Sequence, residues 1–113
     1  MKSYELSEEA QLDLFDAFDF IADRNLNAAI SWHKTMLDTF QHLAVWPHSG
    51  RLRSDLAPAS IRFWIAGEYV ILYEPASDPV KIVTLVHGAR DVEHILAARY
   101  NLLNSKNEED FDD

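Results

Sequence analysis

Arginine and histidine side chains gather in two short segments of this chain, residues 46–53 and 86–91. They read Trp46-Pro47-His48-Ser49-Gly50-Arg51-Leu52-Arg53 and Val86-His87-Gly88-Ala89-Arg90-Asp91. Guanidinium groups stabilise negative charge on phosphate, and imidazoles transfer protons near neutral pH. The same cations can also dock an acidic protein surface. Both segments flank a strand-rich region, so we expect them to form one basic rim at the end of a small sheet.

Cleavage of RNA would need a base for the 2′-hydroxyl, a cation for the phosphorane and an acid for the leaving oxygen. The chain offers cations for the second role and His87, His48 or Tyr73 for the others, but no spacing selects among them. Its five histidines are scattered without paired-ligand spacing, and it has no cysteine. We therefore assign no catalytic residue, and we predict neither a metal site nor a cofactor.

The charge is uneven along the chain. The net charge is -9, and residues 1–46 carry three basic against eight acidic side chains. Residues 47–106 carry seven basic against six acidic side chains, and residues 107–113 add five carboxylates. An acidic protein is poorly suited to sequence-independent binding of nucleic acid, which draws its energy from neutralising phosphates. We expect no direct sequence-specific nucleic-acid binding either, and we expect the partners to be proteins.

Length and composition predict one compact domain. The chain has 113 residues, of which 48% are hydrophobic. We place the domain at residues 1–106 and expect the acidic tail, residues 107–113, to be disordered. Without cysteine, a signal-like segment or a run long enough to span a bilayer, the sequence favours a cytoplasmic protein with no membrane contact.

Two amphipathic helices are predicted in the first half of the chain. A strand over residues 2–6 precedes Ser7, a suitable N-cap for a helix over residues 8–24. A turn at residues 25–27 separates it from a second helix that continues to Trp46 and stops at Pro47. Because the link is so short, the two helices must pack antiparallel.

The second half alternates with the period of strands. Residues 61–65 and 69–74 form a predicted hairpin around Ala66-Gly67-Glu68, and a third strand covers residues 80–87. Its nearly continuous apolar run indicates an interior position. Asp91 then begins a last short helix. The predicted class is α+β: a helical hairpin packed on a mostly antiparallel sheet of about four strands.

This order of elements, with an Arg-bearing loop after the second helix and a closing Gly-x-Arg-Asp turn, resembles the ParE branch of the ParE/RelE toxin superfamily over residues 4–97. The segments that carry the resemblance are Pro47…Gly50-Arg51, Asp55-Leu56, Ile61-Arg62, Tyr69-Val70-Ile71-Leu72-Tyr73 and His87-Gly88-Ala89-Arg90-Asp91. The resemblance implies the toxin of a type II toxin-antitoxin system, of the kind associated with plasmid stabilisation. It implies a non-enzymatic inhibitor of DNA gyrase, held inactive in a hetero-oligomer with a ParD-like antitoxin.

The mRNA-cleaving RelE branch carries an Arg beside the aromatic residue that opens its second hairpin strand. Here that aromatic residue corresponds to Tyr69 and its neighbour is Val70, which cannot stabilise phosphate charge. A RelE-type ribosome-dependent endoribonuclease therefore stays the alternative, together with a non-toxic interaction module of the same fold.

The resemblance suggests two sets of site residues. The candidates for target binding are Arg51, Arg53, Arg62, His87 and Arg90. An apolar excess on the helices suggests an antitoxin surface, for which the candidates are Trp32, Met36, Phe40 and Trp64.

Overall fold

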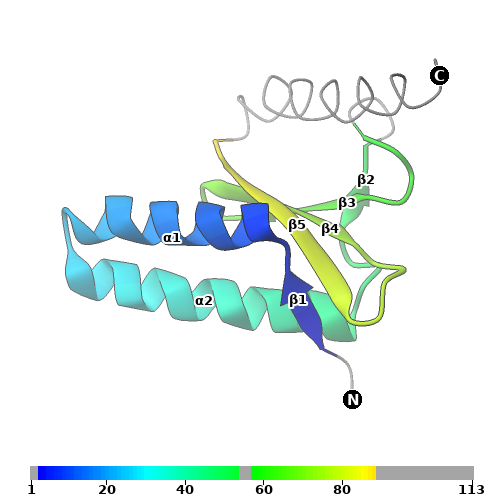
Figure 1. Cartoon of the computed structure of the whole chain (residues 1–113), viewed down its shortest axis with the longest axis horizontal. Coiled ribbons are helices and arrows are strands. Elements are labelled where there is room, and N and C mark those ends of the chain that lie inside the picture. Colours follow the sequence, from blue (N-terminus) through cyan, green and yellow to red (C-terminus); the bar gives the residue numbers. More distant parts are fainter. Residues whose placement is uncertain (1–2, 54–56, 89–113) are drawn as a thin grey trace, which may run out of the picture.

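The computed structural model describes residues 3–53 and 57–88, and it forms a two-layer α+β fold (Figure 1). The elements follow one another along the chain as β1 (Tyr4–Leu6), α1 (Glu8–Ala22), α2 (Leu26–Val45), β2 (Arg51–Leu52), β3 (Arg62–Ala66), β4 (Tyr69–Glu74) and β5 (Val80–His87). The predicted C-terminal helix, Arg90, and the domain boundary at residue 106 lie outside the described residues.

Side-chain caps define the two helices, which lie side by side and antiparallel in Figure 1. The Ser7 hydroxyl accepts a hydrogen bond from the Ala10 amide at 3.0 Å, as expected for the N-cap of α1. Asn25 caps α2 in the same way by accepting from the Ala28 amide at 3.0 Å. Asn25 provides a new cap at the start of the predicted turn, but α2 already begins at Leu26, so the turn lies at Asp23 and Arg24 and not over residues 25–27. α1 ends at Ala22, two residues earlier than predicted.

The sheet has five strands in the order β1-β5-β4-β3-β2, one more than predicted. β1 pairs with β5 in parallel and the other neighbours are antiparallel, which confirms the mostly antiparallel arrangement. The additional strand, β2, was predicted as loop because two residues cannot display an alternating pattern. β5 has the predicted bounds and lies inside the sheet between β1 and β4.

A β-bulge joins the sheet to α1. Leu72 pairs with Thr84 and the next residue, Tyr73, pairs with Ile82, so Val83 is the extra residue on β5. Residues of α1 and its cap bind the polar groups around the bulge. The Ser7 hydroxyl donates to the Val83 carbonyl at 2.6 Å, and the Asp13 carboxylate accepts from the Thr84 hydroxyl at 2.6 Å and the Leu85 amide at 3.0 Å. These bonds fix the position of α1 along β5.

Apolar side chains pack on both faces of the sheet. One cluster joins the helices to the sheet through residues such as Leu14, Phe40 and Tyr73. The other lies on the opposite face and comprises Ala57, Ile61, Phe63, Val70, Leu72 and Val86. Ile61 and Phe63 contribute to that face, whereas Ile65 near the end of β3 is 64% exposed.

Candidate functional site

The loop between α2 and β2 is held by the phenol of Tyr73. Its hydroxyl donates to the Pro47 carbonyl and accepts from the Gly50 amide, both at 2.8 Å. Nη1 of Arg62 donates to the Gly50 carbonyl at 2.8 Å. Because Tyr73 is fully buried and belongs to a central strand, these bonds anchor the loop to the rigid part of the fold. We call Tyr73 and Arg62 with this loop the loop clamp.

Glycine is the only residue type that fits at position 50 in the loop clamp. A Cβ atom at this position would lie 2.5 Å from the Tyr73 hydroxyl oxygen and 2.8 Å from the Phe63 carbonyl oxygen. Both distances are too short for non-bonded atoms, and the second contact is with backbone. The missing side chain lets the loop approach the sheet closely enough for Arg51 to pair with Phe63.

The environment of the clamp also affects the ionisation of the phenol. Burial raises the pKa of Tyr73 above its ordinary value, while the hydrogen bond from Gly50 and the charge of Arg62 lower it in part. The phenol therefore stays protonated at neutral pH and can donate to Pro47 while it accepts from Gly50.

Arg51 and Arg53 remain as exposed cations beside the clamp. They share residues 46–53 with two exposed apolar side chains, Trp46 at 62% and Leu52 at 49%. We call this stretch the basic segment. A mixture of guanidinium and aromatic groups is typical of protein interfaces. Arg62, by contrast, is half-buried and committed to the loop.

His87 lies at the other end of the sheet. It pairs with Tyr69 at the start of β4, whereas Arg62 pairs with Tyr73 near its end. Tyr69 and Tyr73 are four residue steps apart along β4, which corresponds to about 13 Å. His87 instead stacks on Tyr69, with ring centroids 4.9 Å apart, and its Nε2 lies 3.4 Å from the Glu68 carboxylate. The expectation of one basic rim that includes His87 is therefore wrong.

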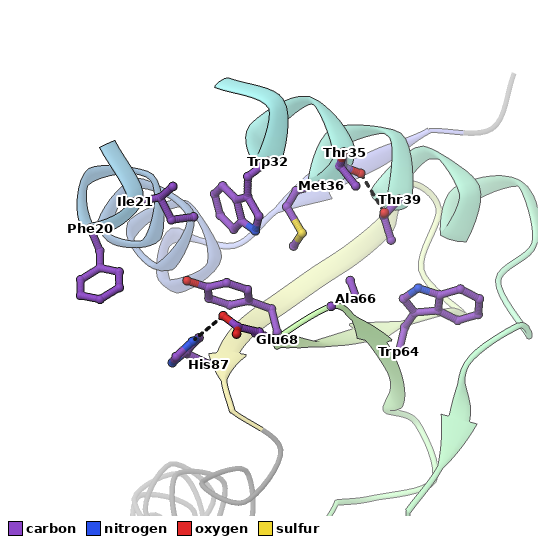
Figure 2. Close-up of a pocket in the computed structure, with 12 residues that line it drawn as sticks. Phe20, Ile21, Trp32, Thr35, Met36, Thr39, Trp64, Ala66, Glu68 and His87 are labelled. Carbon is purple, nitrogen blue, oxygen red and sulfur yellow. Dashed lines mark hydrogen bonds and ion pairs between the residues drawn. The ribbon is translucent and has the colours of Figure 1, made fainter. Parts of the chain in front are cut away.

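An apolar groove opens between the helices and the β3–β4 hairpin (Figure 2). Its volume is about 320 Å³, and Trp32 and Met36 of α2 face Ala66 of β3 across it. The ring of Trp32 packs 5.2 Å from that of Tyr69. At the rim of the groove Phe20 is 54% exposed. We call this site the aromatic groove.

The groove adjoins an open stretch of sheet edge. β2 pairs only with Arg62 and Phe63, so residues 64–66 of β3 have no strand on their outer side within the described part of the chain. Trp64 lies in this stretch and lines the groove, where its ring packs 5.3 Å from that of His42. An extended segment of a partner can therefore reach both the groove and this edge.

The comparisons with known proteins agree with this architecture. The family described as "ParE toxin of type II toxin-antitoxin system, parDE" matches residues 4–92. The chain belongs to the ParE toxin family. A solved structure described as "Chromosomal ParDE TA system from P. aeruginosa" is 14% identical, with a TM-score of 0.65. That match covers 78% of this chain and 97% of the other and shows the same fold. No curated protein matches the chain.

Within this ParE fold, the candidate residues from the sequence fall into separate places. Trp32 and Trp64 are half-buried at the aromatic groove. Met36 is 1% exposed at the bottom of the groove, and Phe40 is fully buried against Tyr4. These two were candidates for an antitoxin surface, but their position on the apolar stripe of α2 makes them core residues.

Two groove residues of this ParE-family chain were missed in the sequence. Phe20 lies outside the apolar stripe of α1, and a large apolar side chain on the polar side of a helix is a signal for a binding surface. Tyr69 was noted as the first residue of a strand and as the counterpart of the RelE aromatic residue, but not as part of a binding surface. In the part of the chain that the structure describes, no metal-ligating cluster is present. Neither described helix is long and apolar enough to cross a membrane.

Proposed function

We propose that this ParE-family protein inhibits DNA gyrase by binding it, and that a ParD-like antitoxin neutralises it in the cytoplasm. The observation that carries the proposal is the family match over residues 4–92, which includes α1, α2 and all five described strands. The exposed pair Arg51 and Arg53, held in place by the loop clamp, is the proposed contact with the target.

The positions of the polar residues favour binding over RNA cleavage. Val70, at the position where the RelE branch carries an arginine, is 4% exposed and packs in the apolar cluster behind the sheet. Arg62 is bound to a backbone carbonyl, about 13 Å along the sheet from His87. A general base and a phosphate-binding cation must act on the same group, so this pair does not suit the reaction.

Two parallel assays test the choice between target classes. Purified protein is added to a gyrase supercoiling reaction and, separately, to translating ribosomes. We expect supercoiling to fall while the mRNA stays intact. Cleaved mRNA with normal supercoiling would support the RelE-type alternative, and an absence of both effects would support a non-toxic interaction module.

The aromatic groove is the proposed antitoxin site. An amphipathic helix can bury its apolar side chains against Phe20, Trp32 and Trp64, and an adjoining extended segment can pair with β3 at residues 64–66. This arrangement uses apolar surface that is already concave and exposed. An antitoxin in the groove does not contact the basic segment directly. It would block target binding either by steric hindrance or by a conformational change.

A matched pair of variants tests this placement. A ParD-like antitoxin is coexpressed with the Phe20→Ala protein or with the Trp46→Ala protein. Both lose an exposed aromatic ring, but only Phe20 lines the groove. We expect Phe20→Ala to weaken the complex by about tenfold or more, equivalent to about 1.4 kcal/mol, and Trp46→Ala to leave it unchanged. Equal affinities for the two variants would place the antitoxin elsewhere.

A further inference from the structure

A second apolar surface follows the seam between α1 and α2. Both helices contribute residues at the spacing i, i+4, i+7, i+11: Gln11, Phe15, Phe18 and Ala22 from α1, and Leu26, Ile30, His33 and Leu37 from α2. Phe18 and His33 meet edge to face with ring centroids 5.9 Å apart, which places the two rows side by side. We call this surface the outer seam.

The outer seam is both hollow and exposed. A cavity of about 490 Å³ lies along it, lined by Gln11, Leu14, Phe15, Phe18 and His33. Phe15 is 67% exposed and Ile30 is 53% exposed. Large apolar side chains that line an open depression mark a binding surface rather than core.

The seam is separate from the aromatic groove. Ile30 belongs to the seam and Trp32 to the groove, and two residues of helix turn their side chains about 200° apart. None of the residues that line the seam cavity also lines the groove. A partner that fills the groove therefore leaves the seam open.

The charge beside the seam is acidic. On α1, the exposed carboxylates nearest the seam row are those of Glu8 and Asp19, whereas Asp16 lines a pocket with Phe20 and His87 on the groove side of the helix. None of these carboxylates makes an ion pair within the described part of the chain. On the other side of the seam, Lys34 is the single lysine or arginine of α2. A ligand of the seam must therefore combine an apolar face with positive charge.

We propose that the outer seam binds an amphipathic helix of another protein, with lysine or arginine beside the apolar stripe of that helix. Burial of Phe15, Leu26 and Ile30 supplies the affinity, and the carboxylates of α1 orient the basic side chains. A second copy of this chain fits less well because it would bring its own acidic α1 toward the same surface. The proposal does not depend on the gyrase target or on the occupant of the groove.

Two designed peptides test the proposal on the full-length protein. Both are 18-residue helix-forming sequences with the same leucine stripe, flanked by lysine in one and by glutamate in the other. We expect the lysine peptide to bind at least tenfold more tightly in a fluorescence anisotropy titration, and we expect this advantage to shrink as salt rises. Equal affinity of the two peptides would contradict the proposal that the carboxylates of α1 select a basic partner.

Matched variants locate the binding site. Phe15→Ser with Ile30→Ser removes two exposed side chains from the seam, and Leu52→Ser with Ile65→Ser removes two exposed side chains elsewhere. We expect the seam pair alone to weaken binding of the lysine peptide, by at least tenfold, with unchanged circular dichroism. Unchanged affinity in the seam pair would overturn the proposal, as would a concentration-dependent dimer of the wild-type protein that the seam pair abolishes.

Discussion

At the scale of single residues, the loop clamp explains why a buried tyrosine lies in the middle of an otherwise apolar sheet. The hydroxyl of Tyr73 satisfies an amide and a carbonyl of the α2–β2 loop. No buried side-chain nitrogen or oxygen is left without a partner in the described part of the chain. The polar atom of Tyr73 therefore determines where the basic segment lies, while its ring fills the core.

We predict that Tyr73→Phe lowers the free energy of unfolding by about 1–3 kcal/mol, because it leaves the Gly50 amide buried without an acceptor. Tyr69→Phe is the matched control, since no hydrogen bond of its hydroxyl is present within the described chain. Urea denaturation of both variants measures the difference. Equal stability of the two variants would show that the clamp contributes nothing.

The same phenol gives a pH dependence at the alkaline end. Burial raises the pKa of Tyr73 in the folded protein above its ordinary value of 10.0. The folded state therefore retains a proton that the unfolded state loses, so stability is full below pH 10 and falls as the pH rises above it. We expect thermal unfolding between pH 9 and about 11 to show this loss, and the loss to be smaller in Tyr73→Phe. A flat profile would contradict this assignment.

At the scale of elements, α1 is attached to the sheet at the bulge of β5. The Asp13 carboxylate accepts from the Thr84 hydroxyl and the Leu85 amide, and Thr84 is 2% exposed. β1 pairs with β5 only as far as Ile82, so no strand lies on this side of β5 at Leu85. The Leu85 amide and the buried Thr84 hydroxyl therefore need an acceptor outside the sheet.

We predict that Asp13→Ala destabilises the protein by about 1.5–3 kcal/mol, the range for hydrogen bonds to a charged group. Asp16→Ala removes a carboxylate from the same helix but takes away none of these bonds, and we expect it to change stability by less than about 0.5 kcal/mol. Chemical denaturation compares the two. If both variants behave alike, the bulge is stabilised by other contacts.

Local signals in the sequence were sufficient to predict most of the helices and strands. Ser7 is the N-cap of α1 as predicted, and the turn before Val80 gave β5 its bounds. β2 escaped prediction because its pairing with β3 depends on the contact of Tyr73 with Gly50, 23 residues apart. The distance between His87 and Arg62 could have been predicted from the sequence. Arg62 begins the first of three consecutive antiparallel strands and His87 ends the third, and these two positions lie at opposite ends of a sheet.

At the scale of the whole molecule, three surfaces lie on different parts of the fold. The basic segment follows the end of α2, the aromatic groove lies between α2 and the β3–β4 hairpin, and the outer seam lies between α1 and α2 (Figure 1, Figure 2). Opposite charges of the basic segment and the helical hairpin allow each surface to select a different partner.

Inhibition of gyrase by charge variants tests the account most directly. Arg51→Glu with Arg53→Glu reverses the basic segment, and Arg24→Glu with Lys34→Glu makes the same change of net charge on exposed positions of the helical hairpin. We predict that supercoiling is inhibited by the wild-type protein and by the helical pair. The Arg51 and Arg53 pair should require at least tenfold more protein for the same inhibition. Supercoiling that is unaffected by the wild-type protein, or equally inhibited by both variants, would contradict the account.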